Sequence, residues 1–182
     1  KCVWLSLKLF ADVGIVGKPN AGKSTLLSKI SGAKPKIADY PFTTLHPILG
    51  VLKKFDQEII VADIPGLIEG AHQGKGLGDQ FLAHIERCKV LLHIVDCSDN
   101  DFITNYNVVH KEIEKYGKNL SSKAELIALS KSDLLPNQIN ELSKKIEKKI
   151  GKKPFVFSSI SNDGIEDLIK ALFNKCLNDD DQ

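Results

Sequence analysis

One segment of the chain carries the residue types and spacing that hold phosphate groups. Residues 17–24 are Gly-Lys-Pro-Asn-Ala-Gly-Lys-Ser and match the pattern GxxxxGK[ST] in full. The glycines let backbone N–H groups converge on phosphate oxygens, and the helix that follows adds partial positive charge at its N-terminus. Lys23 is then placed to reach the β- and γ-phosphates, and the Ser24 hydroxyl to ligate Mg²⁺. The segment predicts a nucleoside triphosphate site without indicating the base. Its expected contacts are Gly17, Lys18, Pro19, Asn20, Ala21, Gly22, Lys23, Ser24 and Thr25.

A second set of residues suits a divalent cation and a ligand-dependent loop. Asp63 ends an apolar run and begins Asp-Ile-Pro-Gly, so its carboxylate is expected to hold Mg²⁺ directly or through water, while the N–H of Gly66 contacts the γ-phosphate. A threonine in the preceding loop can ligate Mg²⁺ only when a γ-phosphate holds that loop in place. The residues leave Thr43 and Thr44 both open for this role. The glycine-rich segment 66–78 predicts a two-state element that the γ-phosphate biases.

A third set can select the base. Asp133 follows an apolar run, and its carboxylate can accept two hydrogen bonds from N1–H and N2–H₂ of guanine, a pair that adenine lacks. The aliphatic stem of Lys131 can lie along the purine face. Ser158, Ser159 and Ile160 follow the next short apolar run and are expected to donate backbone N–H groups to guanine O6.

These residues require a scaffold that brings them to one edge. Apolar runs of strand type alternate with segments whose apolar residues recur at helical spacing. The runs are 13–16, 48–55, 58–62, 90–95, 124–129 and 155–157, with a further alternating stretch at 5–10. The pattern predicts an α/β fold with a mostly parallel six-stranded sheet and helices on both faces. Ligands of such folds bind at the carboxyl ends of the strands, where each of these motifs falls.

Composition narrows the class of protein. The chain has 182 residues, enough for one domain, and a formal net charge of +2, too small to argue for nucleic-acid binding by itself. No apolar run is long enough to span a membrane. The four cysteines form no CxxC pair, which favours free thiols and a cytoplasmic location. The lack of methionine predicts a fragment of a longer protein, with a domain at 1–176 and a disordered tail at 177–182.

The ordered motifs resemble those of Ras-like small GTPase domains, and the loops resemble the Obg family in particular. The segments that carry this resemblance are 17–24, 38–45, 63–78 and 81–87, within a similarity that spans about 5–173. The resemblance implies a monomeric, ribosome-associated GTPase with slow hydrolysis of GTP to GDP, a role in ribosome assembly or stress control, the large ribosomal subunit as partner, and an N-terminal glycine-rich domain missing here. It also implies that Thr44 is the threonine on Mg²⁺, that Phe42 and Thr43 line the nucleotide, and that Lys23, Thr44 and Gly66 act on the γ-phosphate.

The resemblance leaves three points to test. The family usually has Asn at the position of Ser130. That asparagine contacts the base and connects its own loop to the phosphate loop, residues 17–24. Leu67 stands where Ras-like enzymes place a water-orienting glutamine, so unaided turnover is expected to be slow. Asn20 resembles a residue that supports K⁺ in GTPases with the same substitution, although a turn role is equally open. His72 and Arg87 are expected to be non-catalytic. Besides the GTPase, a guanine-nucleotide sensor and an ATPase remain alternatives.

Overall fold

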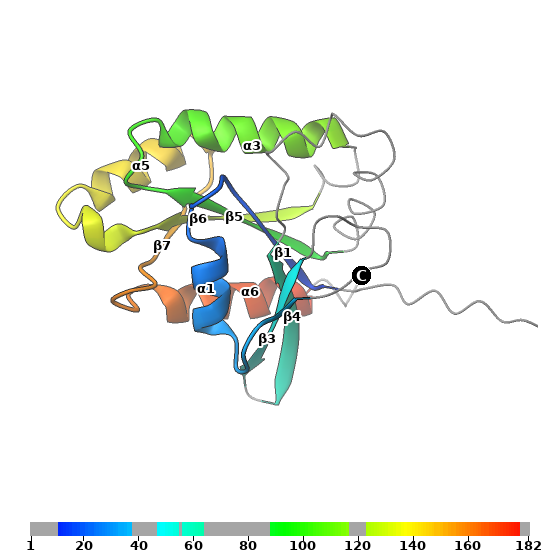
Figure 1. The fold of residues 1–182 in the computed structure, drawn as a ribbon. Helices are drawn as coiled ribbons and strands as arrows, with labels where there is room; N and C mark the ends of the chain where they lie inside the picture. The colour runs from blue at the N-terminus through cyan, green and yellow to red at the C-terminus, as the bar shows by residue number, and fades with distance from the viewer. Residues whose placement is uncertain (1–10, 38–46, 55, 64–87, 117–122, 179–182) are drawn as a thin grey trace, which may run out of the picture.

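Strands and helices alternate along the chain, as its pattern of apolar residues predicts. The computed structural model describes residues 11–37, 47–54, 56–63, 88–116 and 123–178 (Figure 1). The strands are β1 Val13–Val16, β2 Lys36–Ile37, β3 Ile48–Lys54, β4 Gln57–Asp63, β5 Val90–Asp96, β6 Ala124–Ser130 and β7 Phe155–Val156. The helices are α1 Lys23–Ile30, α3 Phe102–Tyr116, α5 Ile139–Ile150 and α6 Ile165–Asn178, with a 3₁₀ turn at Ser132–Leu134.

The strands form one mixed sheet in the order β2-β3-β4-β1-β5-β6-β7. Strand β1 pairs in parallel with β4 and β5, β5 with β6, and β6 with β7, whereas β3 pairs antiparallel with β2 and β4. The predicted α/β class and mostly parallel sheet are confirmed. The sheet has seven strands and not six, because β2 adds two exposed residues at one edge. So short a strand has no apolar alternation by which the sequence could reveal it.

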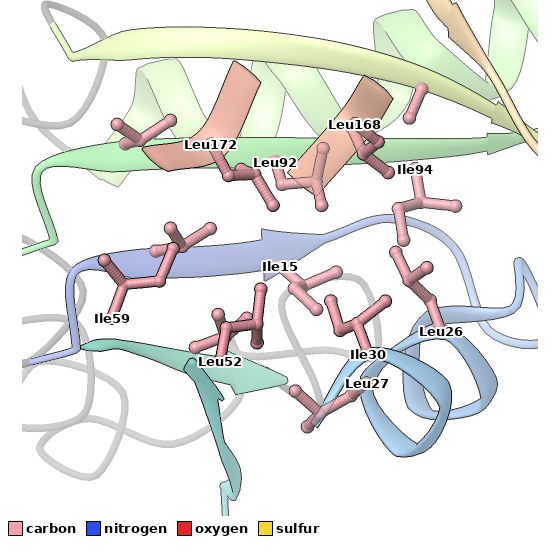
Figure 2. Close-up of a cluster of buried hydrophobic side chains, with 14 of the residues drawn as sticks. Ile15, Leu26, Leu27, Ile30, Leu52, Ile59, Leu92, Ile94, Leu168 and Leu172 are labelled. Carbon is pink, nitrogen blue, oxygen red and sulfur yellow. The ribbon is translucent and has the colours of Figure 1, made fainter. Parts of the chain in front are cut away.

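Alternate residues of the central strands face opposite layers of helices. On one face, Leu92 and Ile94 of β5 pack with Ile15 of β1 against helices α1 and α6, as Figure 2 shows. On the other face, neighbouring β5 residues such as Leu91 and Val95 belong to clusters that include side chains of α3 and α5. Each fully buried Leu or Ile stabilises the fold by roughly 1.5–3 kcal/mol. Helices pack against both faces of the sheet and fix the positions of its strands, so the strand ends form a rigid edge.

The carboxyl ends of the parallel strands meet at that edge. Register pairs Ile15 with Asp63 and Asp96 with Ser130, so β4, β1, β5 and β6 end side by side. The last helix extends to Asn178, two residues past the predicted domain boundary at 176. The stretches 5–10 and 81–85, predicted as strand and helix, lie outside the described residues. Among the helices that the structure describes, none has the length and apolarity that a membrane crossing requires.

Candidate nucleotide-binding site

The loop after β1 needs glycine at both of its ends. A Cβ on Gly17 would lie 2.4 Å from the backbone carbonyl oxygen of Ile94, so no larger residue fits beside β5. Gly22 precedes α1 with φ of 93°, and Asn20 between them has φ of 62°, both in the left-handed region that glycine and asparagine tolerate best. The loop therefore curls over the first turn of α1, where the N-terminal backbone N–H groups of the helix attract an anion.

Lys23 lies against this loop. Its Nζ donates to the backbone carbonyl oxygens of Gly17 at 3.0 Å and Lys18 at 2.9 Å. These bonds hold the ammonium group at the concave side of the loop, where the motif places the phosphate groups. The side chain of Lys18 points elsewhere, because its Nζ donates to Oδ1 of Asn105 on α3. Asn105 in turn donates to Oδ2 of Asp99 at 2.6 Å, so the phosphate loop is fastened to the start of α3.

Asp63 and Ser24 form an oxygen-rich pair beside the loop. The Ser24 hydroxyl donates to Oδ2 of Asp63, whose side chain is buried at the end of β4. The other carboxylate oxygen, Oδ1, is buried without a hydrogen-bond partner. Burial raises the pKa of Asp63, and the Ser24 hydrogen bond and the Lys23 charge oppose that rise. A buried carboxylate oxygen without a partner, next to a hydroxyl, fits a hard cation such as Mg²⁺.

Ser130 joins the end of β6 to the phosphate loop. Its side chain is buried, and its hydroxyl lies 2.7 Å from the carbonyl oxygen of Ala21 and 3.3 Å from that of Val95. The single O–H of Ser130, at the end of β6, therefore provides a hydrogen bond to the carbonyl oxygen of Ala21 in the loop after β1. The serine thus links the end of β6 to the loop after β1, the connection that the resemblance leads us to expect from an asparagine at this position.

Asp133 is oriented by a buried serine. The hydroxyl of Ser158, a fully buried residue after β7, donates to Oδ1 of Asp133 at 2.5 Å. The Ser158 hydroxyl oxygen in turn accepts the backbone N–H groups of Ile160 and Ser161, each at 3.1 Å. Ser158 Oγ thus donates once and accepts twice, which fixes the exposed carboxylate against the turn that follows β7.

Lys131 is held by an acidic residue at the next strand end. Its Nζ lies 2.5 Å from Oδ2 of Asp96, the last residue of β5. Partial burial raises the pKa of Asp96, but the hydrogen bonds from Lys131 and Ser98 outweigh it and the pKa is lowered. Lys131 itself has φ of 60°. This left-handed residue turns the chain sharply after β6. The aliphatic stem of Lys131 and the carboxylate of Asp133 therefore both lie at the edge of the sheet where β6 ends.

Comparison with known proteins assigns the chain to a family. Residues 12–131 match the family model described as 50S ribosome-binding GTPase. The chain belongs to this family. It is 55% identical over 169 residues to GTPase Obg of Rickettsia massiliae (strain Mtu5), and 54% identical over the same length to that of Rickettsia felis (strain ATCC VR-1525 / URRWXCal2). Both alignments cover 92% of this chain, so the predicted resemblance to the Obg family is confirmed. The chain spans about half the length of these curated relatives, 51% in each case.

Solved structures agree on the fold of this 50S ribosome-binding GTPase family member. The G domain of the T. maritima FeoB iron transporter has a TM-score of 0.70 at 18% identity, with 92% of this chain and 99% of that one covered. A putative nucleolar GTP-binding protein 1 from Plasmodium falciparum has a TM-score of 0.70 at 20% identity, with 96% and 90% covered. At this identity the likeness establishes the fold alone.

The structure brings many of the predicted site residues of this GTPase domain to one edge. The loop with Lys23 and Ser24 meets Asp63 on one side and Ser130 on the other. Ser158 meets Asp133, while Thr25 lies exposed in the first turn of α1, and Pro19, like Ile160, is exposed. The residues that lie outside the described part of the chain are Phe42, Thr43, Thr44, Gly66, Leu67, His72 and Arg87.

Two residues at this edge escape sequence reasoning. Asp96 holds Lys131, and Asn105 holds Lys18 beside a cavity of about 280 Å³ between the phosphate loop and α3. Asp96 ends a largely apolar run that His93 alone interrupts, so the rule that ligands bind at strand ends could have singled it out. Asn105 lies within the amphipathic pattern of α3 and gives no such signal.

Proposed function

We propose that the chain binds GTP with Mg²⁺, hydrolyses it slowly to GDP and phosphate, and acts as a cytoplasmic switch at the large ribosomal subunit. Family membership supports the class of reaction. The observation that carries the proposal is that Ser130 ties the guanine-reading segment to the phosphate loop through Ala21. One ligand with a guanine at one end and phosphates at the other fits this connected edge. The cysteines that the structure describes, Cys88, Cys97 and Cys176, are buried free thiols, which suits a reducing compartment.

Guanine selection rests on Asp133 in this proposal. The carboxylate accepts N1–H and N2–H₂ of the base, and the Ser158 hydroxyl keeps it turned toward that position. The N–H of Ile160 is engaged with Ser158 Oγ, so the N–H of Ser159 is the better candidate for guanine O6. The stem of Lys131, drawn back by Asp96, covers the purine face.

Hydrolysis joins a water oxygen to the γ-phosphorus and breaks the bond from that phosphorus to the β–γ bridging oxygen, so GDP leaves with the electron pair. Lys23 moves its ammonium group from two loop carbonyls to the β- and γ-phosphate oxygens, where it offsets the negative charge of the transition state. Ser24, Asp63 and Thr44 would hold Mg²⁺, which supplies further neutralisation of the phosphate charge when bound. Gly66 donates its N–H to the γ-phosphate.

Slow turnover and the switch follow from the loops. Leu67 has an apolar side chain and cannot orient the attacking water, so a partner or a cation is needed for fast hydrolysis. Asn20 is exposed, and its φ of 62° suits a turn residue as well as a residue that supports K⁺. Thr44 and Gly66 contact the γ-phosphate side only in the GTP form, which biases the loop conformations that the ribosome meets.

The test is a competition titration of labelled GDP against GTP, ATP and XTP in Mg²⁺, with and without K⁺. We expect only GTP among these to displace GDP, and Asp133→Asn to move the preference toward XTP. Asp167→Asn is the matched control, because this exposed carboxylate lies on α6. Equal competition by ATP, or an unchanged preference in Asp133→Asn, would contradict the base assignment.

The alternative is a guanine-nucleotide sensor with negligible unaided hydrolysis, which Leu67 favours. Radiolabelled GTP turnover decides between the two, with Lys23→Ala as the background. Mg²⁺-dependent turnover above that background supports the GTPase. Tight GDP binding without turnover, even with ribosomes and K⁺ present, supports the sensor.

A further inference from the structure

The positive charge of the chain is concentrated in one short segment. Residues 144–153 contain six lysines and a single acidic residue, Glu147, which gives this segment a formal charge of +5. The whole chain carries +2, so the remainder carries −3. The small net charge therefore conceals a strongly basic surface on an otherwise slightly acidic molecule, and it is the distribution of charge that bears on polyanion binding.

The fold turns these lysines outward. Helix α5 buries Ile146 completely and packs its flanking apolar residues against the cluster under β5 and β6. Every lysine of 144–153 is exposed. Lys145 pairs with Glu141 at 2.8 Å, and Lys152 pairs with Glu125 at 3.1 Å. We call the remaining four the α5 lysine face: Lys144, Lys148, Lys149 and Lys153.

Interactions within the described part of the chain offset little of the positive charge of this face. No ion pair within the described part of the chain involves the α5 lysine face. Lysines in the last turn of a helix offset its negative end by roughly 0.3–1 kcal/mol each, but only Lys148 and Lys149 lie in that turn. Lys144 lies a turn earlier, and Lys153 follows the C-cap at Gly151. The face carries more positive charge than the helix requires.

We propose that the α5 lysine face binds the phosphate backbone of RNA. Lysine is depleted in protein–protein interfaces, which are enriched in aromatic residues and Met. The exposed large apolar residues among the described positions, Ile37, Val108, Leu134 and Ile160, all lie outside α5. Lysine is instead a usual contact to phosphate groups, which position a protein without reading sequence. The choice of RNA rests on the proposed function at the large ribosomal subunit.

The proposed surface is separate from the nucleotide site. Helix α5 starts at Ile139, beyond Asp133, and the lysines lie along its second half and past its end. Neither the phosphate loop nor Ser158 contacts a lysine of the face through any described hydrogen bond. Neutralising the face is therefore expected to leave GDP affinity unchanged.

The test compares two variants of equal charge change. One carries Lys→Gln at all four positions of the α5 lysine face. The matched control carries Lys29→Gln, Lys111→Gln, Lys115→Gln and Lys175→Gln, exposed lysines of α1, α3 and α6. Fluorescence anisotropy with a labelled RNA hairpin, repeated over a KCl series, gives the slope of log K against log[salt].

We expect the α5 variant to lose roughly 3.6 from the magnitude of that slope, because each of its four phosphate contacts contributes about 0.9. Its affinity is expected to fall by at least roughly 100-fold near 0.1 M salt. The control is expected to lose less than about 1. Equal losses in the two variants would assign the effect to net charge and overturn the proposal, as would undetectable binding of the wild-type chain to the hairpin at low salt.

Sedimentation with purified large ribosomal subunits distinguishes RNA from an acidic protein surface. Loss of subunit binding by the α5 variant together with loss of hairpin binding supports the proposal. Loss of subunit binding with full hairpin binding would assign the face to a protein partner and overturn it. Labelled GDP is titrated in the same samples, so that failure of the nucleotide site appears as lost GDP binding, independently of the RNA result.

Discussion

The connection between Ser130 and Ala21 is open to a direct test by Ser130→Ala. Both residues are about 1% exposed, and the hydroxyl is 2.7 Å from the Ala21 carbonyl oxygen. The change removes a neutral hydrogen bond worth about 0.5–1.5 kcal/mol and leaves a buried carbonyl with one partner fewer, for a total of roughly 1–3 kcal/mol. Because the bond joins the two ends of the proposed nucleotide site, we expect part of this loss to appear as weaker GDP binding.

The assay measures GDP dissociation constants by fluorescence titration and thermal unfolding of the unliganded chain. A loss of about 1–2 kcal/mol in binding corresponds to a roughly 5- to 30-fold rise in Kd. The remainder lowers Tm by roughly 2–4 °C per kcal/mol for a domain of this size. Ser143→Ala is the control, since this half-buried serine lies on α5 and has no side-chain bond to the phosphate loop.

A GDP Kd for Ser130→Ala within about twofold of wild type, with an unchanged Tm, would refute this reasoning. It would mean that the phosphate loop keeps its shape without the hydroxyl. A lower Tm with unchanged GDP affinity would confine Ser130 to stability and remove it from the site. Weaker GDP binding in Ser143→Ala as well would show that the assay responds to general destabilisation.

Two further predictions concern stability. Gly164→Ala places a Cβ 1.9 Å from the carbonyl oxygen of Val156 at φ of 71°, so we expect Tm to fall by roughly 4–8 °C. Gly151→Ala has a similar φ of 77° but open space around it, so its Tm should fall by about half as much. Equal Tm shifts of the two variants in thermal melts would argue against the clash. Burial raises the pKa of Glu125, but the hydrogen bond and charge of His93 outweigh burial and lower it to about 2. Because the folded value lies below the ordinary 4.5, the Glu125 carboxylate stabilises the fold above that pH, and this stabilisation is lost as pH falls toward 2. Urea unfolding of Glu125→Gln should show lower stability at neutral pH and a flatter acid limb, and an unaltered acid limb would contradict the assignment.

Much of the fold is encoded locally and could be predicted. The runs at 13–16, 90–95 and 124–129 are largely apolar, with His93 and Glu125 as the polar exceptions, because strands buried on both faces need apolar residues at most positions. Their order along the chain, alternating with helical spacing, fixes a mostly parallel sheet. The edge strand β2 could not be predicted, since its two exposed residues are defined only by pairing with β3.

The site could be predicted where a motif sits at a strand end, and not where distant residues meet. Asp63 and Asp133 follow apolar runs, and both lie at the predicted edge. The contact between Lys18 and Asn105 joins residues 87 positions apart and depends on how α3 packs over the sheet. The role of Ser158 depends likewise on the turn after β7, which brings its hydroxyl to Asp133. Such contacts follow from tertiary packing, which no local pattern records.

The position of β1 in the sheet has a consequence for synthesis of the chain. All four residues of β1 are buried, and the strand lies between β4 and β5. Gly14 pairs with Ala62, 48 residues later, and with Leu91, 77 residues later. At about 5–20 residues per second, β1 waits roughly 2–10 s after its own synthesis for the first partner and roughly 4–15 s for the second. An apolar strand is thus held on the nascent chain with both edges open until β4 is made and with one edge open until β5 is made. Codons that slow translation between the two partners lengthen its exposure to aggregation and to chaperones.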